Sequence, residues 1–222
     1  MKRFRASPAV VLTAALSLSW ASPWAAAQSD RGRTPADLNA RLAELQKNPK
    51  LAESVQKTGQ KVAAVCANCH GDGGNSIKPE VPNLAGQNSA YLIEQMRRFA
   101  DGSRRNEFME GMIKAMSIDE KIGMAMFYST QSVTPRPAAN ASLLAQGEAY
   151  YQKVCFRCHG TNGHGNDKIA RIAGQQTGYL ASTLKRYRAG SGERVEPAMA
   201  DSTRALTDAN IDAIVAYVAS MK

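Results

Sequence analysis

The chain has 222 residues, a formal net charge of +9 at pH 7 and 21% charged side chains. That length allows one large domain or two small ones. Only 6% of the residues are aromatic and the basic residues are dispersed along the chain, which argues against a nucleic-acid-binding protein.

The first 27 residues have the pattern of a secretory signal peptide. Three basic residues occur within the first five positions, residues 9–18 are mainly apolar, and residues 25–27 are the small residues of a cleavage site. The apolar stretch is too short to span a bilayer comfortably, and an uncleaved membrane anchor is the alternative. We expect cleavage near Ala27 and export of a soluble protein to the periplasm.

Residues 28–49 are predicted to form an N-terminal helical extension. Residues 34–37 have the pattern of a capping box with proline at the first helical position, and Asn48-Pro49 would end the helix. One face of this helix carries Leu38, Leu42 and Leu45. We expect this face to pack on the domain that follows, with docking of a partner as the alternative.

Four cysteines form two C-x-x-C pairs, and a histidine directly follows each pair. The two motifs are Cys66, Cys69 and His70, and Cys155, Cys158 and His159. Paired cysteines in an exported protein also fit a disulfide framework, a four-cysteine zinc site or a redox dithiol. None of these needs the histidine, whereas C-x-x-C-H is the attachment signature of c-type haem. The sequence therefore predicts two covalently attached haem c groups.

The spacing within the motif has a geometric reason. Two thiols three residues apart on one helical turn point the same way. They can form thioethers with the two vinyl groups on one edge of a porphyrin, and the next residue then brings its imidazole to the iron. Cysteines used in this way are not available for a disulfide or for zinc.

The two motifs lie 89 residues apart, and their surroundings are repeated as well. The matching segments are Ala85-Gly86-Gln87 with Ala173-Gly174-Gln175, Tyr91-Leu92 with Tyr179-Leu180, Gly102-Ser103 with Gly190-Ser191, Ser117 with Thr207, and Phe127-Tyr128 with Tyr217-Val218. Such a repeat predicts two copies of one domain, over residues 50–131 and 142–222. Residues 132–141 contain two prolines and are predicted to be an extended linker.

Each copy has the apolar spacing of helices. They are predicted over residues 50–65, 89–101 and 117–129 in the first copy and over 142–154, 177–189 and 207–220 in the second. No segment alternates convincingly with period two. The sequence predicts an all-α fold of two tandem domains, each wrapped around a covalently bound haem.

The sixth iron ligand decides the chemistry of a haem that has histidine on its other side. In the second copy only Met199 and Met221 follow the motif, and Met221 is expected at a frayed C-terminus. Met199 lies eight residues before Thr207, and the same count back from its repeat partner Ser117 gives Met109. We therefore predict Met109 and Met199 as the sixth ligands, with Met112 as the alternative in the first copy.

The other methionines of the first copy and the spare histidine are not expected to bind iron. The core is expected to contain Met96, Met116, Met124 and Met126. His164 follows His159 by five residues on the proximal-side loop and is poorly placed to reach the opposite face of the haem.

With these residues in place, the chain resembles the dihaem cytochromes c4 over about residues 55–222. The segment Pro82 to Gln87, together with Met109, is more specific than C-x-x-C-H alone. The resemblance implies two class I cytochrome c domains packed face to face, with haem edges close enough for rapid exchange. It also implies that the carbonyl of Pro82 accepts a hydrogen bond from His70. The second copy has Ala170 at that position, so we expect a less rigid loop and a different haem potential.

Two filled iron positions favour outer-sphere electron transfer without a bound substrate. We expect a carrier of single electrons, not an enzyme, between a quinol-oxidising complex or periplasmic dehydrogenase and a terminal oxidase. A haem subunit of a periplasmic dehydrogenase is the alternative, and a dihaem enzyme such as a peroxidase is a weaker one because it needs an open or unusual ligand position.

The expected partners are redox proteins, with peripheral membrane association as a further expectation. Residues 135–222 have eleven basic and seven acidic side chains, whereas residues 59–134 have eight of each. A basic second copy fits docking onto acidic partners, and a merely solvated face is the alternative.

Overall fold

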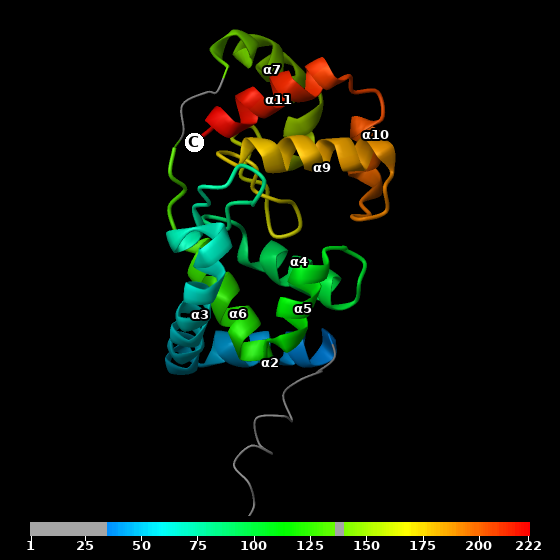
Figure 1. Cartoon of the computed structure of the whole chain (residues 1–222). Helices are drawn as coiled ribbons and strands as arrows, with labels where there is room; N and C mark the ends of the chain where they lie inside the picture. The colour runs from blue at the N-terminus through cyan, green and yellow to red at the C-terminus, as the bar shows by residue number, and fades with distance from the viewer. Residues whose placement is uncertain (1–34, 136–139) are drawn as a thin grey trace, which may run out of the picture.

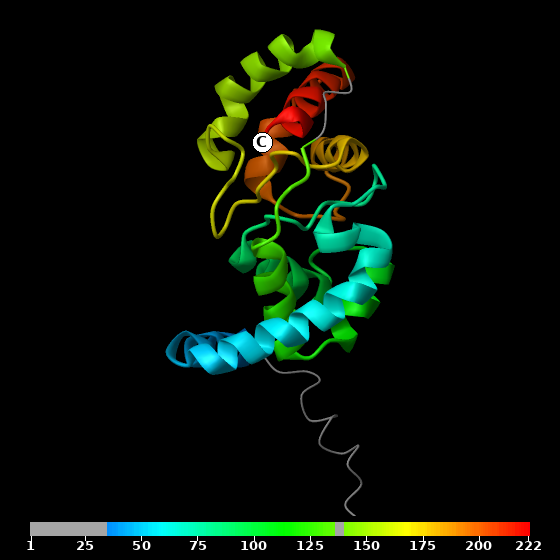
Figure 2. The same cartoon turned by 90° about the vertical axis from the view of Figure 1, so that its left-hand side faces the viewer.

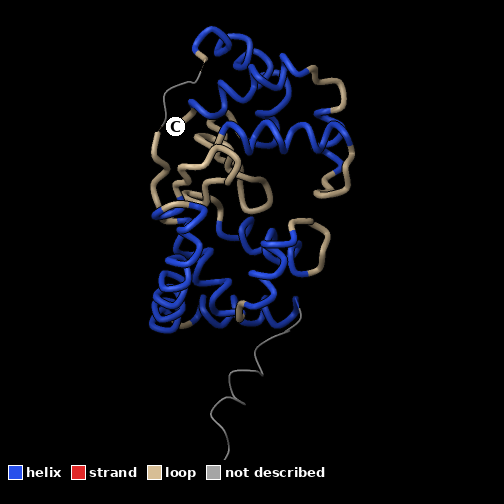
Figure 3. Tube along the Cα trace, viewed as in Figure 1, coloured by secondary structure: helices blue, strands red, loops and turns tan. Residues whose placement is uncertain are grey.

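The computed structural model describes residues 35–135 and 140–222. The predicted signal peptide and part of the predicted linker lie outside the described residues. Within them, the chain forms helices and loops, and the extended pairing is confined to an isolated bridge between Arg104 and Arg194. Two groups of helices are stacked on each other (Figure 1), and loops gather between them (Figure 3). The predicted all-α fold is confirmed.

The first group is built around two helices that cross in close contact. Its elements are α2 (Pro35–Lys47), α3 (Pro49–His70), the 3-10 turn Asp72–Gly74, α4 (Ser89–Ala100), α5 (Glu107–Ala115) and α6 (Ile118–Ser129). The side chain of Asn48 caps α3, and Ser117 and Glu120 form a capping box at the start of α6. A Cβ atom added at Gly59 would overlap the backbone of Gly123, so α3 and α6 approach as closely as only glycine permits.

The second group repeats this arrangement. Its elements are the 3-10 turn Ala141–Leu143, α7 (Leu144–Tyr150), the π turn Tyr151–Cys155, α8 (Phe156–His159), α9 (Thr177–Ala189), α10 (Pro197–Thr203) and α11 (Asp208–Ser220). Thr207 and Asn210 form the capping box of α11. Gly147 lies against Ala213 of α11, as Gly59 lies against Gly123.

The π turn accommodates an extra residue in the second copy. Cys66 is seven residues beyond the crossing glycine Gly59, whereas Cys155 is eight residues beyond Gly147. A π turn holds one residue more than an α turn, so the insertion is absorbed in Tyr151–Cys155, which ends on the first cysteine of the haem motif. The single regular helix predicted over 142–154 is therefore wrong in detail, and in both copies the helical segment continues through the motif to its histidine.

Each domain contains a short helix that periodicity did not predict. α5 and α10 have nine and seven residues, fewer than the about 11 residues over which helical periodicity is usually read. Their starts do carry signals, because the side chain of Asn106 accepts from the backbone N–H of Met109 and Pro197 lies in the first turn of α10. These two helices carry the predicted methionine ligands.

Helix α2 runs across the base of the first domain (Figure 1) and lies beside the start of α3 (Figure 2). Leu45 is buried in a cluster against which Leu38 and Leu42 also pack. Arg41 donates to both carboxylate oxygens of Asp119 at the start of α6, at 2.7 and 2.6 Å. The leucine face thus packs on the first domain as expected. None of the helices in the described residues is both long enough and apolar enough to cross a membrane.

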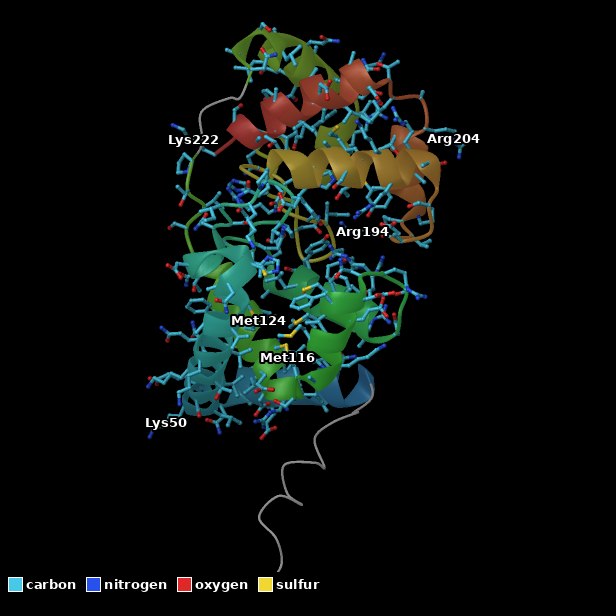
Figure 4. All side chains as sticks on the ribbon, in the orientation of Figure 1. Lys50, Met116, Met124, Arg194, Arg204 and Lys222 are labelled. Carbon is cyan, nitrogen blue, oxygen red and sulfur yellow. The ribbon has the colours of Figure 1, made fainter. Side chains whose placement is uncertain are left out.

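Each domain has a core of its own. Three of the four methionines predicted to be buried lie in the first core, namely Met96, Met116 and Met124. Figure 4 shows Met116 and Met124 between the helices of this domain. Met126 packs against the cluster that contains Leu45. In the second, Met221 packs against the buried residues of α9 and α11 and lies beside Gly163. The expectation that Met221 belongs to a frayed C-terminus is therefore wrong, because the loop after the haem motif gives it a surface to pack on.

Candidate haem sites

The histidine of the first motif is held in one tautomer. His70 ends α3, is buried, and its Nδ1 atom lies 2.8 Å from the carbonyl oxygen of Pro82. Because a carbonyl can only accept, Nδ1 carries the proton and Nε2 keeps its lone pair. Burial lowers the pKa of His70, opposed by the hydrogen bond to Pro82. A neutral imidazole with a free Nε2 is the form that binds iron.

The second histidine has the same environment without the proline. His159 ends α8, and its Nδ1 lies 2.9 Å from the carbonyl oxygen of Ala170. Burial again lowers the pKa of His159. The hydrogen bond that the resemblance implies for Pro82 is therefore present in both domains.

The four cysteines are not bonded to one another. Within each motif the two cysteines are one helical turn apart, and the histidine follows the second of them. Burial raises the pKa of the Cys66 thiol, and raises that of Cys155 to about 11. Cys69 is half-buried and Cys158 is exposed. The two pairs lie on α3 and on the helical segment ending in α8, and no three His, Cys, Asp or Glu side chains within residues 35–135 and 140–222 are grouped so that they could hold a metal ion, so the cysteines are not arranged as one four-cysteine zinc site.

Two arginines lie between the domains, and the kind of partner that each has indicates whether these sites fit haem. Neither Arg104 nor Arg194 forms an ion pair with a carboxylate in the part of the chain that is described. Both donate to the hydroxyl of Tyr179, at 3.1 and 3.0 Å, and Arg194 also donates to that of Tyr91. Arg104 donates to Gln95 at 3.0 Å. Figure 4 shows Arg194 where the two domains meet.

These arginines supply positive charge that the described side chains do not neutralise. Burial favours the neutral phenol of Tyr179, yet the charges of Arg194 and Arg104 lower its pKa below its ordinary value. After burial, the charge of Arg104 further lowers the pKa of His70, and Arg194 acts in the same way on His159. Each haem carries two carboxylates, so a pair of cations shared by the two histidine sites fits two haems.

The predicted methionine ligands have equivalent places. Met109 is the third residue of α5 and Met199 the third residue of α10, and both are half-buried. Met109, and not Met112, packs against the first core. His164 points elsewhere, since its Nε2 lies 3.0 Å from the carbonyl oxygen of Lys222.

Comparison with known proteins decides the family. A family model described as Cytochrome c matches residues 56–128 and 144–222. Cytochrome c4 of Azotobacter vinelandii is 33% identical over 181 residues, which cover 72% of this chain and 86% of that protein. The chain belongs to the dihaem cytochromes c4. This cytochrome is an electron-transfer protein with two haem c groups, and its cysteines at 66, 69, 155 and 158 fit their attachment.

Two further relatives extend the comparison. The crystal structure of reduced recombinant cytochrome c4 from Pseudomonas stutzeri has a TM-score of 0.69 and 30% identity, covering 75% of this cytochrome and 98% of that chain. A thiosulfate dehydrogenase electron acceptor of Thiomonas intermedia is 34% identical over 172 residues, covering 71% of this cytochrome and 79% of that protein.

Sequence reasoning missed the residues between the domains. Tyr91 and Tyr179 were recognised as repeat partners without a role, and Arg104 and Arg194 were not singled out. Arginines at matching places in both copies, just after the paired Gly-Ser segments, were the available signal. The repeat likewise marks the glutamines Gln87 and Gln175 as a pair, but it does not show that they contact the opposite domain.

Proposed function

We propose that this cytochrome carries single electrons in the periplasm, from a quinol-oxidising complex or a periplasmic dehydrogenase to a terminal oxidase. The observation that carries the proposal is the paired geometry of the two domains. In each, a buried histidine keeps Nε2 free while its Nδ1 is fixed by a backbone carbonyl. Each also has a half-buried methionine on a short helix of its own, Met109 on α5 and Met199 on α10.

When bound, each haem supplies an iron that alternates between the ferric and ferrous states. The protein's part is to hold both axial groups. The Nδ1–H bond makes the imidazole a better electron donor, whereas a soft thioether favours ferrous iron and raises the potential. With Met109 and Met199 as the sixth ligands, both axial positions of each iron would be filled by side chains of this protein, and neither would be open to a substrate.

Three observations support the route and the location. The likeness to a thiosulfate dehydrogenase electron acceptor favours a dehydrogenase as donor. The surplus of basic residues in residues 135–222 favours partners with acidic docking surfaces. The pattern of residues 1–27 favours export.

Spectroscopy of single variants tests the ligand assignment. The oxidised protein should show the near-infrared sulfur-to-iron band, and the reduced protein should bind no carbon monoxide. Met109→Ala and Met199→Ala should each open one haem to carbon monoxide and halve the band, whereas Met112→Ala serves as the control and should do neither. Carbon monoxide binding by the unmodified protein, or an unchanged spectrum in Met199→Ala, contradicts the proposal.

A further inference from the structure

The glutamine that ends each Ala-Gly-Gln segment reaches across to the other domain. Gln175 accepts from the backbone N–H of Asn83 at 2.6 Å and donates from Nε2 to the carbonyl oxygen of the same residue at 3.0 Å. Gln175 is 7% exposed and Asn83 is 4% exposed. One side chain of the second domain therefore satisfies both backbone groups of a buried residue in the first.

The reverse contact has the same form. Gln87 accepts from the backbone N–H of Arg171 at 2.8 Å and donates to its carbonyl oxygen at 2.8 Å. Gln87 and Gln175 are repeat partners 88 residues apart, and the same interval separates Asn83 from Arg171. The two contacts are thus related by the internal repeat, each running from one domain to the other.

Both contacts end on a peptide group that also binds a proximal histidine. The peptide joining Pro82 to Asn83 accepts from His70 through its oxygen and donates to Gln175 through its N–H. The peptide joining Ala170 to Arg171 connects His159 to Gln87 in the same way. Because a peptide unit is planar and resonant, a hydrogen bond donated by its N–H fixes and polarises its carbonyl.

The backbone beneath the glutamines is held firmly. Gly86 and Gly174 have φ values of 63° and 69°, in the left-handed region that favours glycine. Their N–H groups donate to the carbonyl oxygens of Tyr128 at 2.9 Å and Val218 at 3.0 Å. Each glutamine therefore starts from a fixed turn of its own domain.

We propose that Gln87 and Gln175 are reciprocal positioning residues, each setting the hydrogen bond to the histidine of the other domain and thereby the potential of the other domain's haem. The inference rests on the proposed ligation by His70 and His159. A stronger acceptor at Nδ1–H makes the imidazole a better donor and stabilises ferric iron. Loss of a glutamine contact therefore raises the potential of the haem across the interface.

Redox titration of the full-length holoprotein tests this directly. Gln175→Met and Gln87→Met keep side-chain length and remove both hydrogen bonds. With each potential assigned through the NMR signals of the haem methyl groups, Gln175→Met should raise mainly the potential of the haem at His70, and Gln87→Met mainly that at His159. Glu196→Gln is the control, since it removes the interdomain pair with Arg98 at 3.4 Å without touching either peptide, and it should give no crossed pattern.

A second measurement separates positioning from general loosening of the interface. In the reduced protein, Gln175→Met should shift the Nδ1–H resonance of His70 and speed its exchange with water while leaving that of His159 in place. If either methionine variant fails to mature, Gln175→Asn and Gln87→Asn are too short to bind both backbone groups and should give the same crossed pattern.

The outcomes that overturn the inference are specific. Equal shifts of both potentials, a larger shift in the glutamine's own domain, or no shift would each reject it. A near-infrared band that persists in these variants shows that the axial ligands are intact, so the proposed function then stands whatever the potentials do. Absence of that band in the unmodified protein would instead reject the proposed ligation.

Discussion

At the scale of the residue, the haem motif is the feature of this protein that can be identified most directly from the amino-acid sequence. Attachment fixes the distance between two thiols and a histidine along the chain, so Cys66, Cys69 and His70 can be recognised without a structure. The residues between the domains have no such local rule. Gln175 meets Asn83 across an interval of 92 residues, and only the fold brings that pair together.

Glu94 should make this protein sensitive to acid. Hydrogen bonds from Arg97, and then from Arg98, lower the pKa of Glu94 from 4.5 to about 2. A carboxylate with a depressed pKa stabilises the fold fully above its ordinary pKa, and this stabilisation is lost as the pH falls from 4.5 towards 2. Because the side chain is 40% exposed, we expect Glu94→Gln to cost only about 0.5 kcal/mol at pH 7.

Urea unfolding at pH 7 and at pH 3 measures this contribution. The difference between Glu94→Gln and the unmodified protein should shrink at the lower pH. Glu53→Gln is a matched control, since Glu53 has one exposed pairing with Lys57 and should change stability less. A difference that grows on acidification would contradict the assignment.

Arg194 should support the reduced state of the haems. Its charge lies between the domains without a carboxylate partner among the described side chains, and a cation near iron favours the less positive ferrous form. We expect Arg194→Gln to lower the haem potentials and to cost about 2 kcal/mol of stability through its lost hydrogen bonds. The exposed Arg204→Gln should change neither quantity. Redox titration and denaturant unfolding check both statements.

At the scale of the element, periodicity identified the longer helices that pack in the two cores and missed the two short helices that carry the proposed methionine ligands. The segments now seen as α4, α6, α9 and α11 have apolar stripes long enough to be recognised. α5 and α10 are shorter than the about 11 residues over which periodicity is usually read, so their capping residues and the repeat were the clearer signals. The π turn was hidden for a related reason, because one inserted residue leaves the helical pattern on either side intact.

Gly59 lies where α3 and α6 cross, and we expect this position not to tolerate a larger residue. An alanine methyl at Gly59 would overlap the carbonyl group of Gly123, so the helices would have to separate. We expect Gly59→Ala to lower the free energy of unfolding by about 3 kcal/mol. Gly111→Ala is the control in α5, where an added Cβ meets nothing within 4 Å, and it should gain up to about 1 kcal/mol. Thermal and denaturant unfolding of the holoproteins compare the two.

At the scale of the whole molecule, the two domains differ in charge more than in shape. Only the second has a clear surplus of basic residues. The exposed Arg157 lies within its haem motif, whereas the exposed Lys50 lies at the far end of the first domain (Figure 4). Encounter with anions is therefore expected to favour the second domain.

Reaction with an anionic oxidant should reveal this asymmetry. The rate at which hexacyanoferrate oxidises the reduced protein should fall as ionic strength rises. Arg157→Glu should slow the reaction about tenfold at low salt, with much less effect from Lys50→Glu. Equal effects of the two substitutions would show that the field of the second domain does not guide the encounter. Stopped-flow kinetics at several salt concentrations provides the measurement.

The side chain of the linker residue Val133 lies beside turns of both domains. A Cβ atom on Gly86 or Gly174 would lie within 3.0 and 2.8 Å of its two methyl groups, so this one side chain rests on the glutamine-bearing turns of both domains. A half-protein produced alone would expose those turns and lose the neighbour that completes them. Two separately produced halves, mixed after haem attachment, should therefore find each other in solution and regain together an electrochemical behaviour that neither shows by itself.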